Sequence, residues 1–107
     1  MIANLQIEIS EWANRNFKDR LPHQPLLGII EEVGELAHAH LKTEQGIRGT
    51  VEQHKLNKVD AVGDIFIYLA DYCTLNNISL EIAIHDTWEK VKQRDWKKNK
   101  EIGHAMS

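Results

Sequence analysis

The chain has 107 residues, which is enough for one compact domain and too few for two. Its composition, 42% hydrophobic and 27% charged, is typical of soluble globular proteins and excludes an intrinsically disordered chain. The formal net charge of -3 gives no support to a general electrostatic contact with nucleic acid, so we expect no such partner.

The sequence shows no sign of export or membrane insertion. The N-terminal stretch MIANLQIEIS lacks the basic region and apolar run of a secretion signal. No apolar run approaches the roughly 20 residues that are needed to cross a bilayer. The single cysteine, Cys73, excludes an internal disulfide and suits a reducing compartment. We therefore expect a cytoplasmic protein that has no membrane contact.

The first two predicted helices flank the only prolines, Pro22 and Pro25. Apolar residues that step by threes and fours between positions 2 and 17 indicate the first helix. Pro25 suits the first turn of the second helix, where its missing N–H has no partner to lose, and this helix should run to about Lys42. Its expected buried stripe comprises Leu26, Ile29, Ile30, Val33, Leu36, Ala37 and Leu41.

Two further helices follow a loop with the sequence TEQGIRG, whose two glycines interrupt the periodicity. Thr50 and Gln53 form a capping-box pattern, which predicts a third helix that reaches about Leu75. After the turn NNIS, Ser79 can cap a fourth helix that contains Leu80 to Val91, and the tail from residue 98 should fray. The third helix should bury Leu56, Val59, Val62, Phe66, Leu69, Ala70 and Cys73.

These patterns define the expected fold class. No period-two alternation bounded by turns is present, so the sequence predicts an all-α protein of four helices. We expect a single domain that covers residues 1–107.

Two stretches, EEVGE at 31–35 and DAVGD at 60–64, repeat one acidic pattern 29 positions apart. Residues three and four apart share a face of a helix, so the acids of each stretch should cluster on one side of their helix. Gly34 and Gly63 each cost about 1 kcal/mol relative to alanine inside a helix. A close approach of the two helices would justify that cost and would bring the acids together at the edge of a buried interface.

Carboxylates held close together repel one another, and a cation relieves the repulsion. Oxygen ligands select Mg²⁺, or Mn²⁺, and helical bundles build such sites from acids on facing helices. His38 follows Glu35 by three residues, a partial match to a di-iron motif, but the third helix has no equivalent histidine. The alternative is a solvated acidic stripe that pairs with nearby lysines.

The segments EEVGEL and VGDIFIYL, followed by WEKVKQRDWKKN, resemble the all-α nucleotide pyrophosphohydrolases of the MazG type, relatives of the dimeric dUTPases and dCTP pyrophosphatases. The resemblance covers most of the chain and implies a four-helix bundle-like MazG fold. It implies Mg²⁺-dependent hydrolysis of nucleoside or deoxynucleoside triphosphates between the α- and β-phosphates, a house-cleaning of nucleotide pools. It also implies a homodimer or homotetramer whose site is completed near a subunit interface.

The family pattern is Glu-x-x-Glu on one helix and Glu-x-x-Asp on the next, which jointly hold Mg²⁺. By position, the resemblance assigns catalytic and metal-binding roles to Glu32, Glu35 and Asp64. The family's remaining glutamate falls at Ala61, and Asp60 is the nearest substitute as a metal ligand. Glu31 would support these acids or orient the attacking water.

The resemblance also suggests substrate contacts. Lys90 and Arg94 lie four residues apart near the end of the last helix and would bind phosphates, although basic residues there also complement the helix dipole. Tyr68, one turn after Asp64, would contact the sugar or base. Trp12 is a further candidate for the base, or else a core residue.

Other readings of the sequence remain open. The departure at Ala61 allows a non-catalytic nucleotide or metal sensor, and a structural helical dimerisation module is a third possibility. The absence of a GxxxxGK[ST] motif excludes a P-loop nucleotide site.

Overall fold

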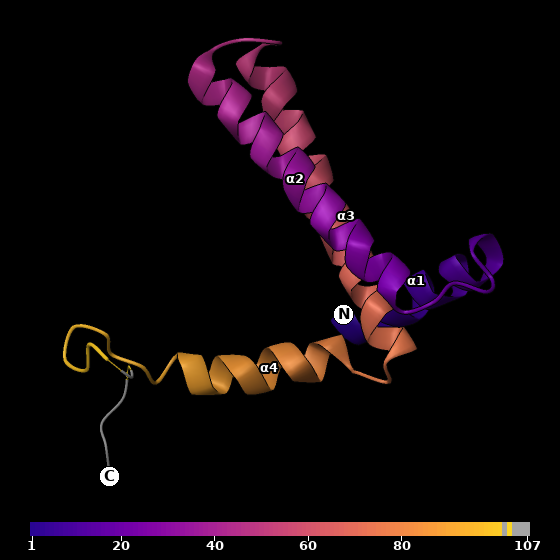
Figure 1. Ribbon diagram of the computed structural model, residues 1–107. Coiled ribbons are helices and arrows are strands. Elements are labelled where there is room, and N and C mark those ends of the chain that lie inside the picture. The colour runs from indigo at the N-terminus through magenta and orange to yellow at the C-terminus, as the bar shows by residue number, and fades with distance from the viewer. Residues whose placement is uncertain (102, 104–107) are drawn as a thin grey trace.

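The computed structural model describes residues 1–101 and 103. Within these residues the chain forms four helices and no strand, which confirms the all-α prediction: α1 (Ile2–Asn16), α2 (His23–Gln45), α3 (Val51–Leu75) and α4 (Leu80–Val91) (Figure 1). None of the described helices combines the length and apolar character that a bilayer span requires. Residues 102 and 104–107 of the tail that was expected to fray lie outside the described part of the chain.

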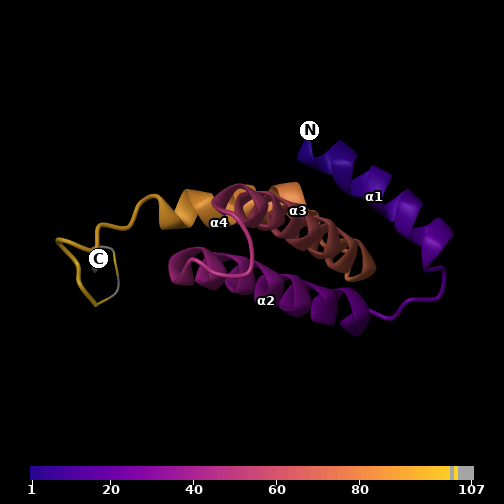
Figure 2. The same cartoon turned by 90° about the horizontal axis from the view of Figure 1, so that it is seen from above.

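A long hairpin of α2 and α3 dominates the molecule, and the two helices lie side by side in both views (Figures 1 and 2). Local signals set its turn. Gly46 ends α2 in the left-handed conformation (φ 68°), which glycine adopts without steric cost. The predicted capping box is confirmed, because the Gln53 backbone N–H donates to the Thr50 hydroxyl (3.1 Å) and the Thr50 N–H donates to the Gln53 side chain (2.9 Å).

α1 lies on the α3 side of the hairpin and closes the junction with α4 (Figure 2). The buried cluster there comprises Ile9, Ala70, Cys73 and Leu80. Gln6 fixes the turn before α4, since its side-chain nitrogen donates to the Ile78 carbonyl (2.9 Å) and its oxygen accepts from the Leu80 N–H (2.9 Å). Beyond this anchored start, α4 extends away from the hairpin (Figure 1).

The predicted buried stripe of α2 is largely exposed, whereas that of α3 is exposed only in its first half, which corrects part of the sequence interpretation. Ala70 and Cys73 of α3 are buried as predicted, and Phe66 and Leu69 are partly buried against the same core cluster. The α2–α3 contact instead uses the neighbouring flank of each helix, where Glu32 and Ala39 of α2 and His54 and Ala61 of α3 are buried. Successive residues of a helix point about 100° apart around its axis. The exposed stripe residues therefore lie beside the seam between α2 and α3 rather than in it. The exposed members are Leu26, Ile30, Val33, Ala37 and Leu41 of α2 and Leu56, Val59 and Val62 of α3.

The expected close approach at Gly34 and Gly63 is also wrong. A Cβ atom added to either glycine would meet no atom within 4 Å, because both residues face away from the seam. The close contact is at Gly28, where an added Cβ would lie 2.5 Å from Cε1 of the Tyr68 ring. The absence of a side chain at Gly28 therefore makes room for Tyr68.

Candidate active site

Three carboxylates gather on α2, where Glu31, Glu32 and Glu35 each offer an oxygen within 4.8 Å of the others. Glu31 and Glu35 are exposed. Glu32 is only 8% exposed, because its position on the helix turns it into the α2–α3 seam. Its Oε2 atom is buried and has no hydrogen-bond partner among the described residues. Such an atom is costly to bury unless another group, a proton or a cation satisfies it.

Acids of α3 face the same side of the hairpin. Asp60 and Asp64 line a hollow of about 380 Å³ together with Glu35 and His38 of α2. The structure therefore brings Glu35 of the first acidic pattern and Asp60 and Asp64 of the second to one pocket, hereafter the acid pocket, which confirms part of the expected meeting of the two patterns. Glu31 and Glu32 do not line it, and the cluster of three acids with oxygens within 4.8 Å of one another contains no acid of α3. Ala61 is buried at its wall and offers no ligand atom, whereas Asp60 is exposed at the pocket one turn before Asp64.

Charge and burial act together on the groups around the pocket. Burial raises the pKa of Glu32 above its ordinary value of 4.5, and the negative charges of Glu35 and Asp64 raise this pKa further. Burial also raises the pKa of Tyr68 above 10.0, with the charges of Glu31 and Glu32 next in effect. Tyr68 therefore lies within electrostatic reach of the carboxylates.

The residues present fit a hard divalent cation. The donor set consists of carboxylate oxygens, which Mg²⁺ and Mn²⁺ prefer over nitrogen or sulfur. The buried, unpartnered oxygen of Glu32 is an acceptor that a cation would satisfy. A cation would also offset the repulsion that raises the Glu32 pKa.

A second hollow, of about 230 Å³, lies on the side of Tyr68 where α1 joins α2. Its lining includes Phe17 and a buried ion pair, in which Arg20 Nε donates to Asp71 Oδ2 at 2.7 Å and Arg20 Nη2 donates to Oδ1 at 2.5 Å. The sequence analysis missed Arg20 and Asp71. They lie 51 positions apart, and no spacing rule links residues across such a distance.

None of the substrate-contact candidates lines the acid pocket, and Tyr68 lines the second hollow instead. Trp12 lines a separate hollow on α1, and its ring centroid lies 5.7 Å from that of Phe17. Lys90 lies in the last turn of α4, which ends at Val91, so Arg94 follows the helix. The expectation that Arg94, like Lys90, lies on the last helix is therefore wrong. Neither residue lines the acid pocket.

No protein-family model matches the chain, and no curated protein or solved structure shows significant similarity to it. The class of protein is therefore defined by the fold and the candidate site alone. The described residues form an all-α chain in which two antiparallel helices place carboxylates around one pocket.

Proposed function

We propose that this chain is a Mg²⁺-dependent nucleoside triphosphate pyrophosphohydrolase of the MazG type. The observation that carries the proposal is the buried, unpartnered carboxylate oxygen of Glu32, which lies within a cluster of acids beside the acid pocket. A solvated acidic stripe, the simpler interpretation of the same residues, gives no reason to bury one of its carboxylates. The resemblance of the surrounding segments to the MazG type supplies the reaction.

In this proposal Glu32, Glu35 and Asp64 hold the cation, with Asp60 at the position nearest to the missing family glutamate. Mg²⁺, or Mn²⁺, would neutralise the polyphosphate charge there and lower the pKa of a bound water. Hydrolysis forms a bond from a water oxygen to the α-phosphorus and breaks the bond from that phosphorus to the α–β bridging oxygen. Pyrophosphate leaves with the electron pair of that bond, and the nucleoside monophosphate remains. A carboxylate of the cluster accepts the proton of the water. Glu31 suits this role, because it is exposed and lies close to the other two acids.

The nucleoside would lie beyond the acids, toward Tyr68. The charges of the acids contribute to the raised pKa of Tyr68, and this residue also lines the hollow that contains Phe17. The phosphate-binding role proposed for Lys90 and Arg94 requires a second copy of the chain, because neither residue lines the acid pocket of its own chain. The same holds for a contact between Trp12 and the base.

A substrate panel tests the proposal. The purified chain is incubated with individual nucleoside and deoxynucleoside triphosphates and Mg²⁺, and pyrophosphate release is measured. We expect Glu35→Gln and Asp64→Asn each to lower the rate by about 100-fold or more. Loss of a group that only orients a metal ligand typically costs about 10–100-fold, and these residues are proposed to be ligands themselves. Glu44→Gln is the control, since Glu44 pairs with His40 on the surface of α2 outside the pocket and should leave the rate unchanged. Full activity in both pocket variants would contradict the assignment.

A second candidate function rests on Ala61. This residue is buried at the pocket wall where the resemblance calls for a metal-binding glutamate, so the pocket has one acid fewer than the family pattern. A nucleotide or metal sensor without turnover would have such a site. It predicts calorimetric binding of triphosphate and Mg²⁺ with no pyrophosphate release across the whole panel.

A further inference from the structure

The positive charge of the chain is concentrated in one short segment. Six of its 13 lysines and arginines, but only one of its 16 aspartates and glutamates, lie within residues 90–100, hereafter the basic segment. The basic segment therefore has a formal charge of +5, while the other residues, with 7 basic and 15 acidic side chains, have -8. Such an asymmetry is typical of a chain that presents one end to an anionic partner.

The basic segment is exposed at the far end of α4, which extends away from the α2–α3 hairpin (Figure 1). Its acid, Asp95, is engaged within the segment, because Asp95 Oδ1 accepts from the backbone N–H groups of Lys97 (3.1 Å) and Lys98 (3.2 Å). Lys92 pairs with Glu89 at the surface (2.9 Å). All six basic side chains are exposed: Lys90, Lys92, Arg94, Lys97, Lys98 and Lys100. The positive charge therefore lies at the surface of the molecule.

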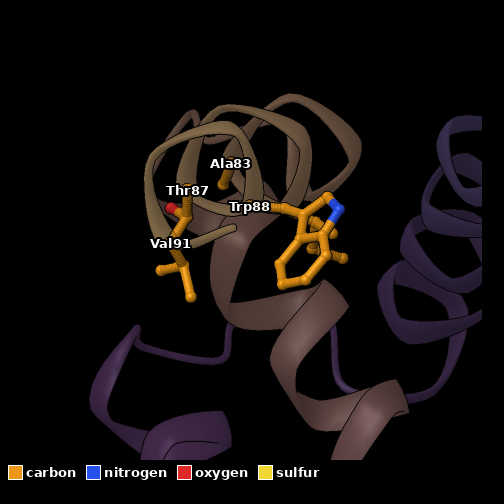
Figure 3. Close-up of a pocket in the computed structure, with 5 residues that line it drawn as sticks. Ala83, Thr87, Trp88 and Val91 are labelled. Carbon is orange, nitrogen blue, oxygen red and sulfur yellow. The ribbon is translucent and has the colours of Figure 1, made fainter. Parts of the chain in front are cut away.

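An apolar surface leads along α4 to the basic segment. One side of the helix lines an open hollow (Figure 3), and the α4 face is defined as the residues of this lining: Ala83, Ile84, Thr87, Trp88 and Val91. Its large members are open to solvent, since Ile84 is 45% exposed and Trp88 is 57% exposed. Asp86 and Glu89 each lie two residues from a member of this face, and two residues turn a side chain by about 200° around a helix. Both acids therefore lie on the other side of α4.

We propose that α4 and the basic segment bind the surface of a membrane that contains anionic lipids. The α4 face lies at the boundary between headgroups and acyl chains, as in helices with apolar residues and tryptophan on one side. Trp96, which is 52% exposed, adds a second indole ring at this interface. The basic side chains contact lipid phosphates, since clusters of about four to eight Lys or Arg beside such a helix attract anionic headgroups. The sequence-based expectation of no membrane contact rests on the absence of a spanning segment, which a peripheral contact does not need.

A membrane accounts for more of these observations than a nucleic acid does. A single-stranded nucleic acid would engage the positive charge and stack on Trp96, but it would leave the α4 face in water. A membrane surface covers that face and also neutralises the charge. Anionic lipids repel the acidic remainder of the chain, so the acid pocket stays open to solvent. The proposal is independent of the proposed catalysis, because it rests on α4 and on the distribution of charge.

Sedimentation of the full chain with lipid vesicles tests the proposal. We expect the chain to sediment with vesicles of equal parts phosphatidylcholine and phosphatidylserine, and to stay in solution with vesicles of phosphatidylcholine alone. High salt should release it, because salt screens the attraction between the basic segment and the headgroups. Tryptophan emission should shift to shorter wavelength on binding. That shift should persist in Trp12→Phe, whose residue lies on α1, and should be smaller in Trp88→Phe.

A triple variant locates the contact. Each basic residue near an anionic surface strengthens binding by about fivefold, so Lys97→Gln/Lys98→Gln/Lys100→Gln should weaken binding to the anionic vesicles by about 100-fold. These lysines are not among the proposed phosphate contacts, so their effect on vesicle binding does not depend on catalysis. The matched control, Arg15→Gln/Lys18→Gln/Lys55→Gln, removes three exposed charges elsewhere and should bind like the unaltered chain. Because all six side chains are exposed, both variants should keep the helical circular dichroism of the unaltered chain.

Two results would overturn the proposal. Equal binding of the two triple variants would show that the basic segment does not contact the lipid. Failure of the unaltered chain to bind either vesicle would exclude a membrane contact, and binding of single-stranded oligothymidylate in its place would assign the basic segment to a nucleic acid.

Discussion

Glu32 shows how one residue can couple folding to ligand binding. Its carboxylate is buried, one oxygen has no hydrogen-bond partner among the described residues, and the charges of Glu35 and Asp64 lie nearby. Burial and these charges disfavour the ionised form, so the folded chain holds a proton on Glu32 more readily than the unfolded chain does. A bound cation would offset the negative charge of Glu32 and its neighbours, so Glu32 could stay ionised in the folded chain.

The raised pKa of Glu32 sets the direction of a pH dependence. Below the ordinary pKa of 4.5 this carboxyl is neutral in both states and costs nothing. As the pH rises from there through the raised pKa of the folded state, the unfolded chain ionises first, so the contribution of Glu32 lowers stability. We therefore expect Glu32→Gln to raise the melting temperature at pH 7 in EDTA, and to abolish the stabilisation that we expect Mg²⁺ to give the unaltered chain.

Thermal denaturation with and without Mg²⁺, from pH 4 to pH 8, measures this effect relative to the unaltered chain. Glu44→Gln provides the control, because Glu44 is exposed and pairs with His40 on the surface of α2. If the Glu32→Gln and Glu44→Gln curves coincide at every pH, the carboxylate of Glu32 is not the strained group described above.

At the scale of elements, the ion pair of Arg20 and Asp71 attaches the link between α1 and α2 to α3. The guanidinium makes three hydrogen bonds to the carboxylate, two from Nε and one from Nη2, and its remaining nitrogen donates to the Asn14 side chain (2.9 Å). Both side chains are at least nine-tenths buried. The pair is therefore fully satisfied, and it holds one wall of the hollow beside Tyr68.

Removing one member of this pair should cost far more than removing both. Arg20→Met leaves the Asp71 carboxylate buried without its partner, which typically costs about 3–5 kcal/mol. The double variant Arg20→Met/Asp71→Leu removes both charges and should recover most of that loss. Urea denaturation gives the free energies of unfolding, with Arg15→Met on the exposed side of α1 as the control. A double variant as unstable as Arg20→Met alone would contradict the argument.

The helices could be predicted from the sequence because their ends depend on neighbouring residues. Thr50 and Gln53 lie within one turn of each other, and the Ser79 hydroxyl accepts from the Ile82 N–H three residues away. The choice of buried flank depends on contacts between helices. α2 carries small or buried residues such as Ala39 on one flank and large aliphatic residues such as Ile30 on the next. A periodicity argument favours the larger residues, whereas the structure of the chain buries the smaller ones.

The same distinction applies to the candidate site. Helical spacing places Glu32 and Glu35 on adjoining parts of one helix, and the repeat on α3 predicts that Asp64 lies opposite, as the structure shows. The neighbouring ion pair could not be predicted, because Arg20 and Asp71 meet only after α1 packs on α3. The four-residue spacing of Lys90 and Arg94 suggests that both lie on the last helix, but α4 ends at Val91, before Arg94.

At the scale of the whole molecule, the junction of α1, α3 and α4 contains the main buried cluster of the described chain. Ile9 of α1 packs among Ala70, Cys73 and Leu80, and these residues tie three helices together. Burial in this cluster also raises the pKa of the Cys73 thiol, so little of the reactive thiolate forms at neutral pH. Alkylation of Cys73 therefore reports on opening of the junction.

Ile9→Ala should open this junction before the α2–α3 hairpin is lost. Truncation of a buried isoleucine costs about 2–5 kcal/mol, a large part of the roughly 5–15 kcal/mol that stabilises a typical domain. We expect Cys73 to react slowly with iodoacetamide in the unaltered chain and at least about 30-fold faster in Ile9→Ala, the factor that corresponds to the lower end of that cost. Ile7→Ala, on the exposed side of α1, is the control and should leave the rate near that of the unaltered chain. Circular dichroism recorded on the same samples separates opening of the junction, which retains most helical signal, from global unfolding. Equal alkylation rates in the two variants would show that α1 does not cover Cys73 in solution.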